Sequence, residues 1–341
     1  MISSQLFLQG KGLKKLLILI ICISSLFGCT SIGTHILANP KVYLSDSRSE
    51  NVDLERAIAE KRQFCQTDVT ECIDYIYAEA YKPSNFREVE NVRYTIDATS
   101  NGVTNNFTYS ATPEQFQRMS GTVILFHGFG AAKEVMLTTA VYFRALGMDV
   151  ISLDLFGHGE SKRDFVFGAK EHATVNKLIN EIETGADNKL AKPIIVVGHS
   201  MGALPATNVL LESGYVDGAI LLAPMTRFDR AAKFYIADKN PIVDKLFSSS
   251  LDDIISTSMN QAGVSLNDTD VVQKIKNTTK PTLIINSDVD SISPVGSFLQ
   301  AKNQFVQFAV AEGRSHPSLL AFDNVDAALV ELWLSINFDS L

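Results

Sequence analysis

Apolar runs of strand length alternate with amphipathic segments through the C-terminal two thirds of the chain. Continuous apolar strands separated by helices are typical of a parallel sheet that is buried on both faces. The pattern therefore predicts an α/β domain with helices on both sides of a mostly parallel sheet. The expected strands lie at 121–128, 148–155, 193–199, 218–224, 281–287 and 305–310, and the expected helices at 132–146, 167–183 and 201–212.

Two flanking regions complete the predicted domain, which spans 91–341. Alternating residues over 92–100 and 105–112, with a turn signal at Asn101-Gly102, predict a β-hairpin before the parallel strands. Helical periodicity over 317–335 predicts a closing helix. The residues expected to face the core there are Leu320, Val325, Leu329 and Leu332.

One interval, 226–279, breaks the alternation of strands and helices. It is far longer than one helix and its loops require. Apolar residues such as Leu251, Ile254 and Ile255 recur within it at helical spacing. Two interpretations are open: an additional core helix, or a helical lid over a site. The lid would follow the strand at 218–224, which is the sixth strand of the domain when the two hairpin strands are counted. The surplus length favours the lid.

The first 28 residues have the composition of an export signal. Three lysines between positions 11 and 15 precede an apolar stretch that ends at Cys29. The stretch "LFGC" at 26–29 resembles a bacterial lipobox. That resemblance implies a signal peptide over 1–28, lipidation of Cys29 by chains such as palmitate, and a lipid-anchored place in the bacterial cell envelope. Ser31 after the cysteine favours the outer membrane. A transmembrane anchor, or cleavage at another position, is the alternative.

Between the expected lipid anchor and the domain, we expect a tether over 29–50 and an N-terminal helical segment over 51–90. Cys65 and Cys72 form an even pair in an exported chain, which favours a disulfide. Seven residues along one continuous helix would separate their Cα atoms by about 10 Å, so a disulfide requires a break between them. Two free buried thiols are the alternative.

The charge of the chain limits its partners. Without residues 1–28, which carry three lysines and no acidic residue, the net charge falls from −8 to −11. So acidic a chain, with no basic cluster, argues against nucleic acid as a partner, and membrane attachment would depend on the lipid itself. The sequence has no metal-ligand spacing and no dinucleotide or phosphate motif, so we expect no metal and no cofactor.

Residues suited to acyl transfer follow four of the predicted strands. The stretch 127–130 follows the first strand, Ser200 the third, Asp288 and Asp290 the fifth, and His316 the sixth. Ligands of open α/β sheets bind beyond the carboxyl ends of the strands. A serine hydroxyl becomes a nucleophile when an imidazole takes its proton, and a carboxylate fixes the tautomer of that imidazole.

The stretch "GHSMG" at 198–202 predicts a sharp turn from strand to helix. Glycines flank Ser200 because such a turn is strained and closely packed. The turn places Ser200 at a helix N-terminus, so the N–H of Met201 is expected to point at a developing oxyanion. The N–H of Phe129, in a glycine-rich loop, is expected to be the second donor.

Five stretches together resemble the α/β-hydrolase family, in the branch of monoacylglycerol lipases, lysophospholipases and serine aminopeptidase-like hydrolases. They span 120–317 and read LFHGFG, ISLDLFGHGES, IIVVGHSMGA, PTLIINSDVDSISP and GRSHP. The resemblance implies the α/β-hydrolase fold, and the chain order of Ser200, an acid and His316 is the one that this fold requires. The Asp-x-x-x-Pro spacing of the family identifies Asp290 as the acid, with Asp288 as the alternative.

The other polar residues near these motifs have structural interpretations. His127 and His199 serve the loop and the elbow in the family, and His158 lies in a turn that supports the oxyanion loop. His172 falls in an expected surface helix and His35 in the tether, so His316, downstream of the acid, is the expected base. Asp154 is expected to hydrogen bond to the loop that follows it.

Together these features predict a serine hydrolase that cleaves carboxylic esters through an acyl-enzyme. The resemblance to monoacylglycerol lipases and lysophospholipases implies acyl or lipid-like esters as substrates. A serine aminopeptidase or amidase is the second hypothesis, because that branch shares the motifs. The third is a non-catalytic binding lipoprotein on the same fold. The expected partners are a small-molecule or lipid ester and, through the N-terminal lipid, a membrane.

Overall fold

The computed structural model of the chain describes residues 29–40, 60–65, 72–81, 92–100, 103–185, 189–239 and 241–338. Three features expected from the sequence lie outside these residues. They are the signal peptide at 1–28, the part of the tether after residue 40, and the turn at Asn101-Gly102.

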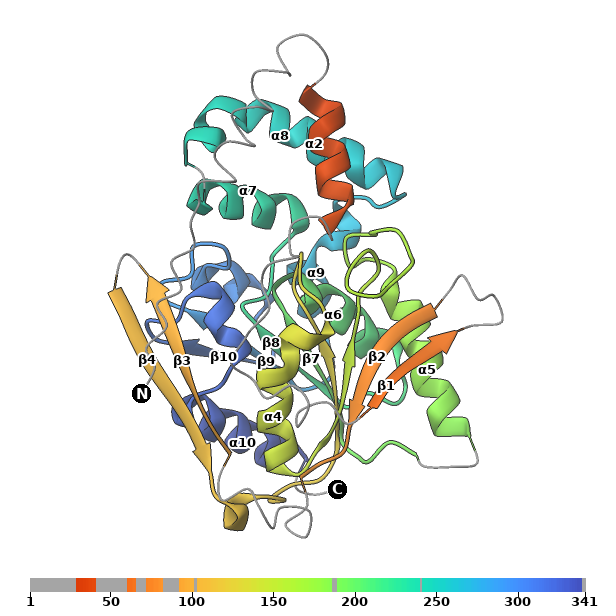
Figure 1. Cartoon of the computed structure of the whole chain (residues 1–341), viewed down its shortest axis with the longest axis vertical. Helices are drawn as coiled ribbons and strands as arrows, with labels where there is room; N and C mark the ends of the chain where they lie inside the picture. The colour runs from red at the N-terminus through yellow and green to blue at the C-terminus, as the bar shows by residue number, and fades with distance from the viewer. Residues whose placement is uncertain are drawn as a thin grey trace.

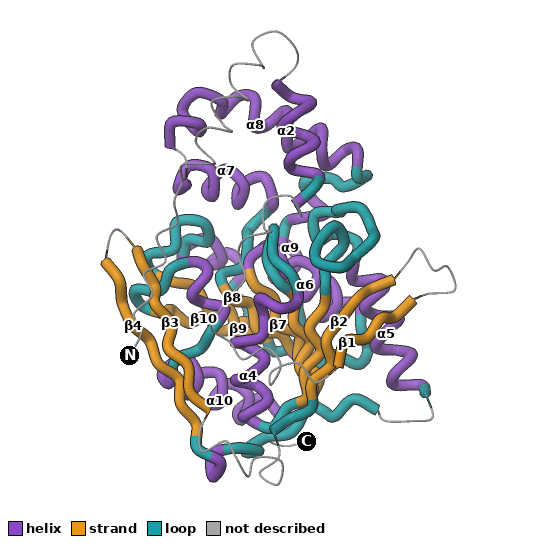
Figure 2. Tube along the Cα trace, viewed as in Figure 1, coloured by secondary structure: helices purple, strands orange, loops and turns teal. Residues whose placement is uncertain are grey.

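An eight-stranded sheet lies at the centre of the described part of the chain, in the order β1-β2-β6-β5-β7-β8-β9-β10 (Figures 1 and 2). The six strands from β6 to β10 in this order are parallel. Five of them fall within predicted strands, and β10 extends one residue beyond the predicted 305–310. The predicted α/β fold is thus confirmed. Their bounds are β5 Thr122–Phe126, β6 Asp149–Leu153, β7 Ile194–His199, β8 Gly218–Leu222, β9 Thr282–Ser287 and β10 Val306–Ala311.

Side chains that alternate along these strands form two apolar cores, one on each face of the sheet. On β7, Ile194 and Val196 belong to the core under helices α5, α6 and α9. Ile195 and Val197 belong to the core under α4 and α10. Both faces are covered, which explains why the strands are apolar without interruption. The bounds of these helices are α4 Leu137–Leu146, α5 Glu171–Thr184, α6 Ala203–Glu212, α9 Val271–Lys276 and α10 Asn324–Phe338.

The helical segment expected over 51–90 is wrong where the structure describes it. Strands β1 (Glu60–Cys65) and β2 (Cys72–Ala78) form an antiparallel pair, and β2 extends the sheet by pairing antiparallel with β6. The edge of β6 offers unpaired N–H and C=O groups, so pairing over a long sequence distance overrides local helical periodicity. Cys65 and Cys72 lie opposite each other across this pair and are joined by a disulfide.

The hairpin expected over 92–112 is present as β3 (Val92–Ser100) and β4 (Val103–Ala111), a separate two-stranded sheet. Tyr94 on β3 donates a hydrogen bond from its hydroxyl to the Phe322 carbonyl at 2.8 Å. The core face of α10 differs from the prediction, because Val325 and Leu332 are exposed. The residues that it buries include Ala327, Val330, Trp333, Leu334 and Phe338.

The insertion at 226–279 has two parts. Helices α7 (Phe228–Lys239) and α8 (Pro241–Gln261) stand beyond the carboxyl ends of the strands as a lid (Figure 1). Helix α9 is instead part of the core, since Val271, Val272 and Ile275 are buried in it. Both interpretations of the insertion therefore apply, to different segments.

The first part of the expected tether is a helix, α2 (Cys29–Ala38), which packs on α8 of the lid (Figure 1). The two helices touch closely at Gly33, where a Cβ atom would lie 2.6 Å from Ile254 Cδ1. Thr34 is buried at the same interface, beside Ser258 of α8. The segment after Cys29 is thus attached to the lid.

Candidate active site

Ser200 lies at a strained turn between β7 and α6, at the start of the short 3₁₀-helix Ser200–Gly202. Its φ of 53° is in the left-handed region, which non-glycine residues rarely adopt. A Cβ at Gly198 would lie 2.5 Å from the Gly202 carbonyl oxygen, and one at Gly202 would lie 2.2 Å from the Phe126 carbonyl oxygen. Only glycine fits both flanking positions, so the backbone holds Ser200 on a sharp elbow.

The structure brings Ser200, His316 and Asp290 together in one chain of hydrogen bonds. The Ser200 Oγ lies 2.9 Å from His316 Nε2, and His316 Nδ1 lies 2.7 Å from Asp290 Oδ2. With its Nδ1–H donated to the carboxylate, the imidazole presents Nε2 as an acceptor for the serine proton. This is the geometry that a serine nucleophile requires.

The two candidate acids have different partners. Asp290 is buried, and its Oδ1 accepts the backbone N–H groups of Ile292 and Ser293 at 2.9 and 3.2 Å, which fixes the carboxylate toward His316. Asp288 instead accepts the Gly313 N–H at 2.7 Å and joins two loops. The structure therefore places Asp290, and not Asp288, against the imidazole.

Two other histidines of the motifs, His127 and His158, connect the loops beside the site. His127 is fully buried, donates from Nδ1 to the Gly128 carbonyl at 2.8 Å and accepts the Leu155 N–H at 3.0 Å. Burial lowers the pKa of His127 to about 4. His158 Nε2 accepts the Gly130 N–H at 3.0 Å, so these two rings connect the loops at 127–130 and 155–158.

The two amides expected to form the oxyanion hole are available at the site. In the part of the chain that the structure describes, neither the Phe129 N–H nor the Met201 N–H has a hydrogen-bond acceptor. The Phe129 amide follows Gly128, which packs closely on His199 and Ser200 of the elbow. The Met201 amide follows Ser200, whose backbone lies in the left-handed region. Two unpaired donors near a nucleophile suit an oxyanion.

A buried ion pair behind the oxyanion loop is a feature that the motifs did not predict in full. Asp154, which is fully buried, accepts hydrogen bonds from the Lys133 N–H at 2.9 Å, from Lys133 Nζ at 2.6 Å and from the Glu160 N–H at 2.8 Å. These bonds confirm the expected structural role of Asp154. The role of Lys133 is not readable from the sequence, because a lone lysine after a glycine-rich loop carries no sequence signal.

Aromatic side chains surround the oxyanion loop. The Phe129 ring, 38% exposed, packs edge to face on Phe165 at 5.5 Å and on Phe228 at 6.0 Å between ring centroids. Phe228 begins the lid helix α7, so the lid contributes to this wall. The lid also contacts the acid loop, because Ser291 Oγ donates to Asp238 Oδ1 at 3.0 Å.

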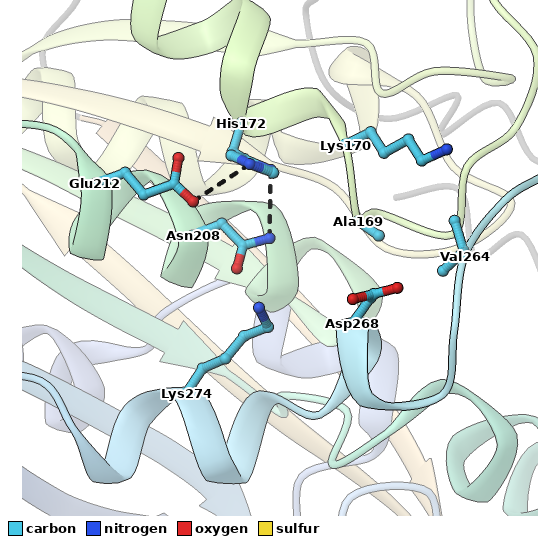
Figure 3. A pocket seen from close by; sticks show the side chains of 8 residues that line it. All are labelled: Ala169, Lys170, His172, Asn208, Glu212, Val264, Asp268 and Lys274. Carbon is cyan, nitrogen blue, oxygen red and sulfur yellow. Dashed lines mark hydrogen bonds and ion pairs between the residues drawn. The ribbon is translucent and has the colours of Figure 1, made fainter.

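A cavity of about 320 Å³ lies apart from these residues, between α5, α6 and the start of α9 (Figure 3). His172 faces it from α5 and contacts Glu212 at 3.3 Å and Asn208 at 3.4 Å. Its lining includes two lysines, Lys170 and Lys274, and two carboxylates, Glu212 and Asp268. None of the three residues of the hydrogen-bonded chain lines this cavity, so it is separate from the candidate active site.

No group of three or more His, Cys, Asp or Glu side chains among the described residues is arranged to hold a metal ion. No helix in the same part of the chain combines the length and the apolar character needed to cross a membrane.

Comparison with known proteins agrees with this fold. Residues 117–280 match the family model described as serine aminopeptidase, S33. An esterase from Pyrococcus furiosus has a TM-score of 0.51 at 18% identity, over 75% of this chain and 94% of that one. A thermophilic esterase from Thermogutta terrifontis has a TM-score of 0.50 at 16% identity, over 82% of this chain and 99% of that one. Among curated proteins, no sequence matches the chain. The sheet topology and these structural likenesses show that the chain has the α/β-hydrolase fold.

Proposed function

We propose that this protein is a serine hydrolase that cleaves carboxylic esters through an acyl-enzyme. The observation that carries the proposal is the continuous chain of hydrogen bonds from Ser200 through His316 to Asp290. The esterases among the structural neighbours agree with it. A binding protein on the same fold has no need of an aligned nucleophile, base and acid, which argues against the third hypothesis.

In the first half of the reaction Ser200 Oγ attacks the ester carbonyl carbon while its proton passes to His316 Nε2. The carbonyl π electrons move to the oxygen, and the N–H groups of Phe129 and Met201 stabilise the negative charge. Asp290 stabilises the imidazolium and keeps its ring in place. The tetrahedral intermediate then breaks its bond to the leaving oxygen, which takes the proton from His316 and departs as an alcohol.

In the second half a water molecule repeats the attack on the acyl-enzyme. His316 Nε2 removes a proton from the water, and the new oxyanion accepts hydrogen bonds from the same two N–H groups. The bond between the acyl carbon and Ser200 Oγ then breaks, and the serine regains its proton from His316. The acid product leaves, and the enzyme returns to its first state.

The surroundings of the site favour an apolar acyl group. The Phe129 ring borders the proposed oxyanion hole and packs on Phe165 and Phe228, so a bound acyl chain would lie against aromatic surface. Esters with acyl or lipid-like chains, of the kind cleaved by lysophospholipases and monoacylglycerol lipases, are the substrates that we propose.

A serine aminopeptidase or amidase is the second candidate, since the matching family model carries that description. An aminopeptidase needs a carboxylate at the site to hold the substrate ammonium group. Asp229, beside Phe228 on the lid, is already paired with Arg227 through contacts of 2.6 and 2.8 Å. This pairing favours the esterase.

Two measurements test the activity. A fluorophosphonate probe should label the wild type and leave a Ser200→Ala variant unlabelled, and equal labelling of both would contradict the assignment of the nucleophile. A series of p-nitrophenyl esters of increasing chain length should then be cleaved faster than aminoacyl p-nitroanilides. Faster cleavage of the anilides would establish the second candidate instead.

The proposal includes a place in the bacterial cell envelope, with Cys29 lipidated and the outer membrane preferred. The support is the lipobox-like sequence that ends at Cys29. Because α2 begins at Cys29 and packs on α8, the lipid would be attached to the lid. Growth with an alkyne analogue of palmitate should label the wild type and not Cys29→Ser. Label retained in the variant would show that Cys29 is not the attachment site.

A further inference from the structure

His199, the residue before the nucleophile, lies between the loop that carries His316 and the oxyanion loop at Gly128. It is buried, with an exposed fraction of 5%. Its backbone leads directly into the Ser200 turn, and its ring lies 5.0 Å from the His316 ring between centroids. The proposed mechanism gives this side chain no part in bond making or breaking.

Among the described residues, the His199 ring makes one hydrogen bond, to the main chain of the proposed base. Nε2–H donates to the His316 carbonyl oxygen at 3.0 Å. The side-chain bonds of His316 to Ser200 and Asp290 orient its imidazole but do not position its backbone. The bond from His199 connects that backbone to the end of β7, on which the nucleophile is built.

The opposite side of the ring faces the oxyanion loop. A Cβ atom at Gly128 would lie 3.1 Å from His199 Nδ1 and 3.2 Å from the Ser200 Cβ, so the loop passes close over the ring because residue 128 has no side chain. Within the described residues, His199 Nδ1 is buried without a hydrogen-bond partner. A buried acceptor without a hydrogen-bond partner is unfavourable, and the site carries this cost while Nε2 makes its bond.

We propose that His199 is a positioning residue, which sets the distance between the base loop of His316 and the oxyanion loop through its Nε2–H bond and its contact with Gly128. The inference rests on the proposed function of Ser200 and His316. It names a role for His199 that its place inside the nucleophile motif does not by itself imply.

The protonation state of His199 suits this role. Burial, with the neighbouring His316 ring, lowers the pKa of His199 to about 3. His199 therefore stays neutral while His316 becomes an imidazolium, and it keeps one donor nitrogen throughout the working pH range. A charged ring at this position would repel the cation that the reaction creates.

Two amide substitutions separate positioning from packing. In His199→Gln the side-chain nitrogen is as many bonds from Cα as Nε2 is, so it can reach the His316 carbonyl. In His199→Asn the nitrogen corresponds to Nδ1, which faces Gly128. Both variants carry a primary amide. They differ in where the N–H₂ group lies, which is toward the His316 carbonyl in Gln and toward Gly128 in Asn.

The readouts are kcat and KM for a p-nitrophenyl ester, the rate of fluorophosphonate labelling and the Tm. We expect His199→Asn to lose about 10–100-fold in kcat and in labelling rate, as a displacement of catalytic groups by about 1 Å does. KM should stay within about twofold of the wild type, because His199 does not touch the substrate. His199→Gln should recover to within about threefold, although the Tm values of the two variants are similar.

Three results would overturn the inference. The first is equal kcat values for the two amide variants. The second is a loss of kcat in proportion to the loss of Tm, and the third is a variant whose KM changes while its kcat does not. A wild type that neither labels nor cleaves any ester would instead refute the proposed function itself. The labelling rate of the wild type therefore distinguishes the two failures.

Discussion

The Lys133–Asp154 ion pair offers a direct test of how the oxyanion loop is held. Both side chains are almost fully buried, and Asp154 accepts three hydrogen bonds, two from Lys133 and one from the Glu160 N–H. Asp154→Asn keeps the size of the side chain but removes the negative charge and turns an N–H₂ group toward the Lys133 ammonium. The ammonium is then left with the more exposed Glu160 and Glu134.

The expected cost follows from the burial of the pair. Removing one partner of a buried ion pair costs about 3–5 kcal/mol, because the other charge stays desolvated. For a domain of this size, that free energy corresponds to a Tm lower by roughly 10 °C. Because Lys133 follows the 127–130 loop, kcat should also fall by about 10–100-fold at temperatures where the variant is still folded.

Thermal unfolding followed by circular dichroism, together with ester kinetics at 20–25 °C, measures both effects. The matched control is Glu331→Gln, which removes one partner of the surface pair Arg118–Glu331 at 2.6 Å. Exposed pairs contribute about 0–1 kcal/mol, so the control should change the Tm little. A loss below about 1 kcal/mol in Asp154→Asn would refute the reasoning. A loss of stability with unchanged kcat would show that the pair does not position the loop.

Four further predictions follow from the described contacts. Asp290→Asn should lower kcat about 10⁴-fold with an unchanged fold, because the imidazole loses the acceptor that fixes its tautomer, and a loss below tenfold would indicate another acid. Burial raises the pKa of Glu171 to about 7. Because the pKa of this carboxyl is raised, the protein has its full stability below about pH 4.5 and loses part of it as the pH rises through 7. Glu171→Gln should therefore have a higher Tm than the wild type at pH 8, and no such advantage at pH 4.5. Reducing the Cys65–Cys72 disulfide, or replacing both residues by Ser, should cost about 2 kcal/mol of stability and leave kcat unchanged, and an equal Tm would show no contribution from the bond. Gly33→Leu should displace α2 from the lid and speed proteolysis between them, with Gly33→Ala as the milder control, and equal rates would contradict a close helix contact.

The sequence alone was sufficient for the parallel sheet and for the residues at its carboxyl edge. Apolar runs buried on both faces are a local signal, and each of the six predicted strands was found. Glycines that flank Ser200 were also readable, because a sharp turn forbids side chains at positions close in sequence. The spacing after β9 identified Asp290 as the residue that the structure places beside His316.

Only the tertiary structure decided the contacts between distant segments. Helical periodicity suggested a helix before residue 90, yet the free edge of β6 takes up β2 as a strand, since pairing depends on a partner about 75 residues away. Val325 and Leu332 were expected in the core, but the rotation of α10 is set by the side chains that it meets on the sheet and not by its own periodicity. The bond from His199 to the His316 carbonyl joins residues 117 positions apart, and a local sequence pattern carries no information on such a pair.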